Sequence, residues 1–318
     1  MSRSSSWCRI SGDGPLPAGK AFLWRLLNRL DNAWRPEAGH PRLRRSRFAP
    51  GLDGPLWEKI DRLDAGLSSP ARRLVLHFLA QFPWAKAIAH LGPLGVADLG
   101  CGRGEAALHL QDFTGGNLQT YQGFDIAPRP EWPALQAKHP FITFRELDSH
   151  AVLADLDPAC NLILSETSLE HIPDDLALFD QIAAWMRRRQ GPLLQLHFLP
   201  AAASLELYGL HGFRQYSPRR VVRLLERLPE NCRATLVSLG GNASAELHRL
   251  WVGPRHDRRG SNPGLYNSSL RQALGRDAPS EAPLFYALLV TGGAPGQSSG
   301  SVDQLADDLQ FPSDNALQ

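Results

Sequence analysis

A run of alternating glycines follows a short apolar segment about a third of the way along the chain. Residues 96–99 read Val-Ala-Asp-Leu, residues 100–104 read Gly-Cys-Gly-Arg-Gly, and helical periodicity begins near Glu105. Glycine tolerates positive φ and lets the backbone approach a ligand closely, and the exposed amides of such a loop bind carboxylates and other polar groups. The segment predicts a binding turn for a nucleotide-like ligand.

Two acids beside this turn distinguish it from a dinucleotide-binding turn. The dinucleotide fingerprint has a third glycine at the place of Glu105, and it does not need an acid at the place of Asp98. The chain also shows no recognisable hydride-transfer pair, so an NAD-dependent oxidoreductase is disfavoured. A simple corner between a strand and a helix is the alternative for an isolated glycine turn.

Residues 98–104 resemble the first motif of class I S-adenosylmethionine-dependent methyltransferases. The resemblance implies S-adenosylmethionine as the cofactor, with its methionine portion held by Asp98, Gly100, Cys101, Gly102 and Gly104. It also implies that Asp125, which ends the segment from Tyr121, accepts hydrogen bonds from both ribose hydroxyls, with Ile126 beside it.

Two further segments extend the resemblance over about residues 74–200. Asp148 lies where the family often carries an acid beside the adenine amino group, although Glu146 or a backbone amide is an alternative. Residues 161–173 are similar to the family's fourth-strand motif, which ends in Leu-Glu-His, and the resemblance places Ser165 and Glu166 at the cofactor. Asn161 replaces the usual acid of that motif.

The predicted reaction depends mainly on alignment, because the sulfonium of the cofactor already makes its methyl group electrophilic. A hydroxyl acceptor would also need a base, for which the candidates are His171, Glu170 and His197, with His171 the first choice. Packing or hydrogen-bonding roles are the alternatives for both histidines. An amine or thiolate acceptor would need no base.

A polar and aromatic cluster follows these motifs. We expect His211, Arg214 and Tyr216 to line an acceptor pocket for a small molecule or a glycan, with Arg214 pairing with a carboxylate or phosphate. The alternative is a structured connection that leads into the helix capped by Ser217.

The elements around these residues alternate between strand and helix patterns. Apolar strand patterns occupy residues 96–99, 121–126, 162–164, 193–198, 234–239 and 284–291. A serine followed by a proline, which favours the start of a helix, occurs at Ser69 and again at Ser217. This predicts an α/β fold with a Rossmann-like, doubly wound, seven-stranded sheet, mostly parallel with a reversed last strand. Residues 253–283 form a longer insertion than the last two strands need, and we expect it to contribute to substrate recognition.

The regions outside this domain are expected to differ from it. We predict a flexible leader and basic helical extension over residues 1–69, the methyltransferase domain over 70–292, and a disordered tail rich in Gly, Ser and Asp over 293–318. The extension contains a helix near residues 21–34 whose apolar residues should pack on the protein itself, with membrane contact or a pocket cover as alternatives: Phe22, Leu23, Leu26, Leu27 and Leu30.

Composition excludes several classes of protein. The net charge is +2, with 43% hydrophobic and 21% charged residues, as in ordinary globular domains. The four cysteines are far apart, so we predict no metal site and no disulfide framework. The chain shows no signal-peptide pattern and no apolar run long enough for a bilayer, so a cytoplasmic protein is expected.

Two alternatives to small-molecule methylation remain open. The basic arm and the Arg-Arg-Arg run at 187–189 suggest RNA methylation, although the sequence contains no stacking-aromatic series or known RNA module. The other alternative is a non-catalytic protein that uses the same fold to bind the cofactor or to scaffold partners.

Overall fold

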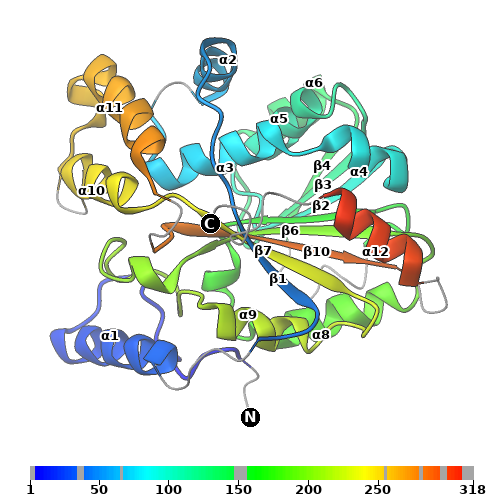
Figure 1. Cartoon of the computed structure of the whole chain (residues 1–318), viewed down its shortest axis with the longest axis horizontal. Coiled ribbons are helices and arrows are strands. Elements are labelled where there is room, and N and C mark those ends of the chain that lie inside the picture. Colours follow the sequence, from blue (N-terminus) through cyan, green and yellow to red (C-terminus); the bar gives the residue numbers. More distant parts are fainter. Residues whose placement is uncertain are drawn as a thin grey trace.

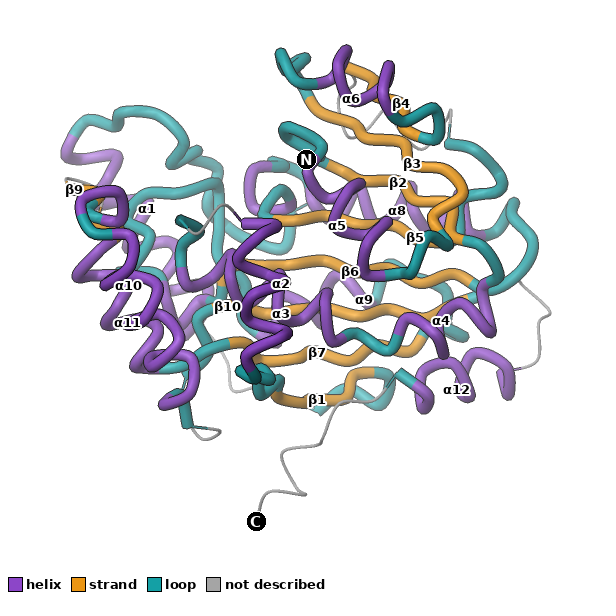
Figure 2. The backbone as a smooth tube through the Cα atoms, turned by 90° about the horizontal axis from the view of Figure 1, so that it is seen from above, coloured by secondary structure: helices purple, strands orange, loops and turns teal. Residues whose placement is uncertain are grey.

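The computed structural model describes residues 4–33, 39–64, 67–146, 156–253, 256–278, 282–293 and 299–309. Its centre is an eight-stranded sheet in the order β1-β7-β10-β6-β5-β2-β3-β4, which Figure 2 shows from above. The strands are β1 (Leu43–Arg47), β2 (Leu94–Leu99), β3 (Leu118–Asp125), β4 (Ile142–Glu146), β5 (Leu162–Glu166), β6 (Leu193–Pro200), β7 (Arg233–Leu239) and β10 (Phe285–Gly292).

All neighbouring strands of this sheet are parallel except β10, which runs antiparallel to both β6 and β7. The predicted fold class is therefore confirmed, including the reversed last strand. The sheet has one strand more than predicted, because β1 adds to the edge beside β7. Its sequence, Leu-Arg-Arg-Ser-Arg, lacks the apolar pattern of the six strands that the sequence analysis located. β4 was not located from the sequence either.

Helices cover both faces of the sheet and enclose two cores (Figure 1). One core contains side chains of α3 (Pro70–Gln81), α4 (Trp84–Leu91), α5 (Glu105–Phe113), α10 (Asn242–Trp251) and α11 (Pro263–Arg276). The other contains side chains of α8 (Asp175–Met186) and α9 (Pro218–Leu225). The predicted helix start at Ser69 is confirmed, since its hydroxyl accepts a hydrogen bond from Arg72 N at 3.4 Å.

The insertion between β7 and β10 is largely helical. It contains α10 and α11 and, between them, a small hairpin of β8 (Val252–Gly253) and β9 (His256–Asp257), followed by the 3-10 turn η3 (Arg259–Ser261). The remaining elements are α2 (Gly54–Asp64), α6 (Trp132–Lys138) and the 3-10 turns η1 (Leu169–His171) and η2 (Ala202–Ser204).

The predicted disordered tail is wrong for residues 299–309. These residues form α12 (Ser299–Asp308), which lies against α4, β7 and β10. Val302, Leu305 and Leu309 are buried at helical spacing, so one apolar stripe is sufficient to fix an otherwise polar segment. Residues 310–318 lie outside the described residues.

The predicted flexible leader is also wrong where the structure describes it. Ser5 N donates to Asp175 at 2.7 Å, Ser6 Oγ donates to Asp31 at 2.6 Å, and Gly12 N donates to Gly212 O at 2.7 Å. Hydrogen bonds to distant residues hold this segment in place. It therefore lacks the apolar periodicity from which an ordered segment is predicted. The leader continues into α1 (Ala18–Ala33), the predicted basic helix.

The apolar side of α1 is not where the sequence analysis places it. Phe22, Leu23, Leu26 and Leu30 are exposed, whereas Leu27 is partly buried. The buried residues of the helix are Trp24, Asn28 and Asp31. Among the described helices, none is both long enough and apolar enough to cross a bilayer.

Candidate functional site

A cavity of about 1280 Å³ lies at the carboxyl ends of the central strands. The chain passes outward from β2 to β3 and β4 and then returns to β5 on the other side of β2, and a ligand site is expected at such a reversal of strand order. We name two parts of this cavity after the ligands that the sequence analysis expects there. The cofactor end is lined by residues 98–103, 125–126 and 166–168, and the acceptor end by Asp13, His171, Tyr208, His211 and His248.

The glycine turn lines the cofactor end. Gly100 and Gly102 have φ of +81° and +53°, a backbone conformation that favours glycine. A Cβ at Gly100 would overlap Ser168, whereas a Cβ at Gly102 would meet no atom within 4 Å. Cys101 also lines the cavity, but Gly104 does not, because it lies at the start of α5 against Phe144.

Two carboxyl groups that line the cofactor end each have a buried, unpaired oxygen. Asp98 Oδ2 accepts a hydrogen bond from Tyr121 OH at 2.5 Å, but Asp98 Oδ1 and Glu166 Oε1 have no partner. Burial raises the pKa of Asp98 to about 8 and that of Glu166 to about 7. A cationic ligand would compensate this desolvation, so this end of the cavity fits a ligand with positive charge.

Asp125 lies where the resemblance implies, at the end of β3 and beside the turn. Its Oδ2 accepts from Gly102 N at 2.9 Å, and its Oδ1 lies 3.4 Å from Arg129 Nη2. The next residue, Ile126, lines the cavity and is 75% exposed. Asp125 therefore fixes the turn as well as facing the cavity. Asp148 lies outside the described residues.

Ser165 and His197 do not reach the cavity, so the predicted cofactor contact and the predicted base are both wrong in geometry. They are paired on neighbouring strands, and Ser165 Oγ lies 2.8 Å from His197 Nδ1. His197 Nε2 lies 3.1 Å from Gln195 Oε1, and burial lowers the pKa of His197 to about 3. Both side chains are fully buried and absent from the cavity lining.

Arg214 and Tyr216 are likewise buried and do not line an acceptor pocket. Arg214 donates to the carbonyls of Ile172 and Pro173 at 2.6 and 2.8 Å, and it lies 3.6 Å from the buried carboxylate of Asp175. Tyr216 OH bonds to Leu169 O and to Asp175. These two residues hold the segment that carries Glu170 and His171, which is a positioning role.

The acceptor end brings together two imidazoles and two carboxylates. His171 Nδ1 lies 2.8 Å from Asp13 Oδ1, and His211 Nε2 lies 3.5 Å from Glu170 Oε1. The two imidazole rings are 4.6 Å apart at 87°. Glu170 is fully buried and does not line the cavity, so it can influence an acceptor only through its neighbours.

The charges of this cluster follow from its contacts. The pKa of His211 is raised, chiefly by its contact with the Glu170 carboxylate, whose Oε1 lies 3.5 Å from His211 Nε2. Burial favours the neutral form of Asp13, but hydrogen bonds from His171, Ser11 and Gly212 outweigh burial and lower the pKa of Asp13. Asp13 is thus an ionised carboxylate at neutral pH. Asp13, His171 and His211 also present ligand atoms within 4.8 Å of one another, a set that could hold a metal ion.

Several residues of the acceptor end were not predicted from sequence. Asp13 belongs to the leader, Tyr208 precedes His211 by three residues, and His248 lies on α10. Tyr208 contacts His248 and Phe285 with ring centroids 5.2 and 5.9 Å apart. Of these residues, Tyr208 was the one that the sequence could have indicated, because it lies three positions before the predicted site residue His211. Arg259 also lines the cavity, so the insertion does contribute to it.

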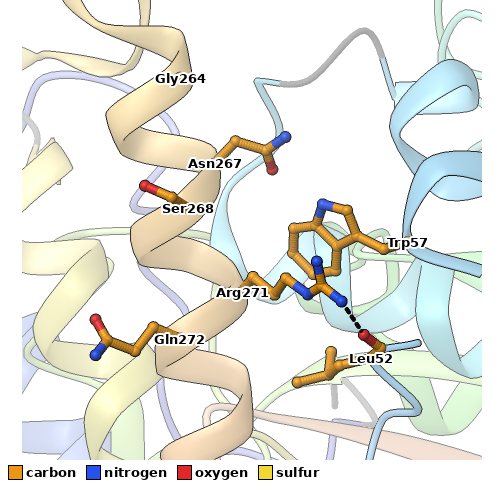
Figure 3. A pocket seen from close by; sticks show the side chains of 7 residues that line it. All are labelled: Leu52, Trp57, Gly264, Asn267, Ser268, Arg271 and Gln272. Atoms are coloured by element: carbon orange, nitrogen blue, oxygen red, sulfur yellow. Dashed lines mark hydrogen bonds between the residues drawn. The ribbon is translucent and has the colours of Figure 1, made fainter. Parts of the chain in front are cut away.

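A second hollow, of about 640 Å³, lies between α2 and α11 (Figure 3). Arg271 donates to Leu52 O at 2.5 Å across it, and the guanidinium lies 5.6 Å from the Trp57 ring. Its lining includes none of the motif residues and no acid or histidine. The chemistry-bearing residues therefore gather in the first cavity.

Comparison with known proteins agrees with this geometry. A family model described as a methyltransferase domain matches residues 71–240, more than half of the chain. Comparison with curated proteins finds no match.

The similar solved structures differ widely from this chain in sequence. Geranyl diphosphate C-methyltransferase from Streptomyces coelicolor A3(2) is 14% identical, with 88% of this chain and 100% of that chain covered and a TM-score of 0.45. The [4+2]-cyclase SpnF is 13% identical, with 90% and 100% covered and a TM-score of 0.44. The plantazolicin methyltransferase BamL is 12% identical, with 74% and 89% covered and a TM-score of 0.42. Because the family model covers more than half of the chain, the chain belongs to the S-adenosylmethionine-dependent methyltransferase family.

Proposed function

We propose that the protein transfers the methyl group of S-adenosylmethionine to a hydroxyl of a small polar or glycan-type acceptor. The observation that carries this proposal is the Asp13–His171 pair at the acceptor end, with 2.8 Å between Oδ1 and Nδ1. A carboxylate that orients an imidazole in this way is a common arrangement for a general base. A hydroxyl acceptor needs such a base, whereas an amine does not.

The residues of the cofactor end fit this cofactor. When bound, S-adenosylmethionine supplies an electrophilic methyl group on a positively charged sulfur. The unpaired oxygens of Asp98 and Glu166 would face its cationic groups, and the backbone of Gly100 and Gly102 would allow its close approach. Asp125 would serve the ribose.

The acceptor end would then provide the proton transfer. Ionised Asp13 accepts the hydrogen on His171 Nδ1, so His171 Nε2 carries a lone pair that can take the proton of the acceptor hydroxyl as its oxygen is methylated. Glu170 raises the pKa of His211, which favours the protonated form of this imidazole, and a protonated imidazole cannot accept the proton of the acceptor. The rings of Tyr208 and Phe285 offer an apolar wall for a sugar or another ring.

RNA as the acceptor is not favoured, because several of the arginines that suggested it are bonded within the protein. Arg42 donates to Leu225 O and Pro229 O at 2.9 and 2.7 Å, and Arg189 is buried and donates to Pro192 O at 2.7 Å. Arg44 pairs with Asp307 at 2.5 Å. These contacts explain part of the basic arm and of the Arg-Arg-Arg run as structural features.

Labelled cofactor offered with separate pools of sugars, phenols, amines and RNA tests the proposal. We expect label in a hydroxyl-bearing small molecule, with turnover unchanged by a chelator because the Asp13–His171 pair acts without a metal. Label in amines or RNA alone would contradict the proposed acceptor class. Loss of turnover on chelation, with recovery on adding a divalent ion, would instead assign Asp13, His171 and His211 to a metal. Cofactor binding without turnover on any pool would favour the non-catalytic alternative.

A further inference from the structure

The helix α1 is oriented with its apolar residues toward solvent. Phe22, Leu23, Leu26 and Leu30 are 66%, 43%, 39% and 40% exposed. They fall on one side of the helix, since they are spaced by one, three or four residues. Figure 1 shows α1 at the margin of the molecule, away from the sheet.

The opposite side of α1 attaches the helix to the protein, mainly through polar groups. Trp24 Nε1 donates to Gly212 O at 3.0 Å, and the side chain of Asn28 contacts Phe213 O at 3.4 Å. Asp31 is buried and lies 2.8 Å from Arg220 Nη2. These bonds fix the rotation of the helix, so the exposed leucines are a consequence of its attachment and not of fraying.

The exposed charges of α1 are all positive. The helix carries Lys20, Arg25 and Arg29, and its one acid, Asp31, is buried. On a helical wheel these three cations flank the apolar stripe. Arg29 Nη2 also lies 2.5 Å from Glu206 Oε1. Both side chains are largely exposed, however, and an exposed ion pair is only weakly attractive.

We propose that α1 is a docking surface for an anionic phospholipid bilayer. An apolar stripe bordered by lysine and arginine is the pattern of helices that lie in the interfacial plane of a membrane, where the stripe enters the acyl boundary and the cations meet phosphate groups. The inference stands independently of the proposed acceptor. Because Trp24 and Asn28 hold the segment next to His211, docking places the acceptor end of the cavity near the bilayer.

Cosedimentation with lipid vesicles tests this inference on the full-length protein. We expect binding to vesicles of equal parts phosphatidylcholine and phosphatidylglycerol, weakened by salt, and little binding to phosphatidylcholine alone. The double variant Phe22→Ser/Leu26→Ser should lower vesicle affinity at least about tenfold, because it removes two apolar contacts. Leu265→Ser is the matched control, since Leu265 is 53% exposed on α11, and it should bind as the unaltered protein does.

Several outcomes would overturn the inference. The protein would remain in the supernatant with both kinds of vesicle, or the control would lose binding as much as the double variant. A dimer that the double variant dissociates, without vesicle binding, would show that a second copy of the chain covers the stripe. Unchanged thermal unfolding of the double variant should accompany the supporting result, because both altered residues are exposed.

Discussion

The cofactor end of the cavity comes from residues that follow three neighbouring strands, whereas the acceptor end comes from segments scattered along the chain. Residues 98–103, 125–126 and 166–168 meet because β3, β2 and β5 are adjacent and parallel. Asp13, His171, Tyr208, His211 and His248 meet only because the leader, a 3-10 turn, a loop and α10 pack together. The difference teaches that the proposed cofactor site depends on sheet topology, whereas the proposed acceptor site depends on long-range packing that can vary without changing the sheet.

His171→Asn should show the largest difference between its effect on catalysis and its effect on cofactor binding. We expect kcat to fall about 10²- to 10⁴-fold, because the proposed base is lost, while cofactor affinity stays within about twofold. Methyl transfer assays and calorimetry measure the two quantities. His139→Asn, which changes a histidine outside the cavity lining, should leave both unchanged. An equal loss of cofactor affinity would place His171 at the cofactor end.

Arg214→Met should break the scaffold of the acceptor end. It leaves the buried Asp175 carboxylate without its cation, so the free energy of unfolding should fall by about 3–5 kcal/mol. Chemical denaturation measures this change. Arg227→Met removes an exposed pair with Asp180 and should cost less than about 1 kcal/mol. A normal stability for Arg214→Met, combined with a raised acceptor KM, would restore Arg214 as a substrate ligand.

Gly100→Ala and Gly102→Ala distinguish two reasons for glycine in the turn, a positive φ and the lack of space for a side chain. Both positions have positive φ, for which alanine costs about 1–2 kcal/mol, but only the methyl group at 100 would also overlap Ser168. We therefore expect Gly100→Ala to lower thermal stability more than Gly102→Ala. Equal effects in differential scanning calorimetry would show that Ser168 moves aside.

The pH dependence of cofactor binding should be a smaller effect, confined to the cofactor end. With pKa values raised to about 8 and about 7, Asp98 is mostly protonated and Glu166 about half protonated at pH 7, and a cationic ligand favours the ionised form of both. Affinity should therefore rise with pH from 6 to 8, by at most about tenfold per unit for each proton released. Calorimetry in buffers of different ionisation enthalpy measures that release.

Asp98 and Glu166 also determine the direction in which the stability of the ligand-free protein changes with pH. Because their pKa values are raised in the folded state, the folded protein holds more protons than the unfolded chain between about pH 4 and 8. Their contribution to the free energy of unfolding therefore falls as pH rises through this range. Glu166→Gln should flatten both trends, and an unchanged pH dependence in that variant would assign the protons to other groups.

The sequence predicted most of the sheet and most of the cofactor end, because apolar strands and a glycine turn are local patterns. The strand over 121–126 appears as β3 with Asp125 at its end, and Ser69 begins α3 as expected. Ser165 fails for a reason that a linear motif does not contain. Alternate residues of a strand point to opposite faces, and Ser165 faces His197 in the core.

The sequence by itself determined a parallel α/β sheet and a family turn, since hydrophobic periodicity and glycine backbone freedom act over a few residues. Only the tertiary structure decided that Asp13 meets His171, that Arg214 is internal, and that α1 presents its leucines to solvent. Each of these depends on a polar contact between residues distant along the chain, and such a contact leaves no periodic pattern to read. Hydrogen bonds between distant segments, and not apolar spacing, fixed the part of the molecule that we propose binds the acceptor.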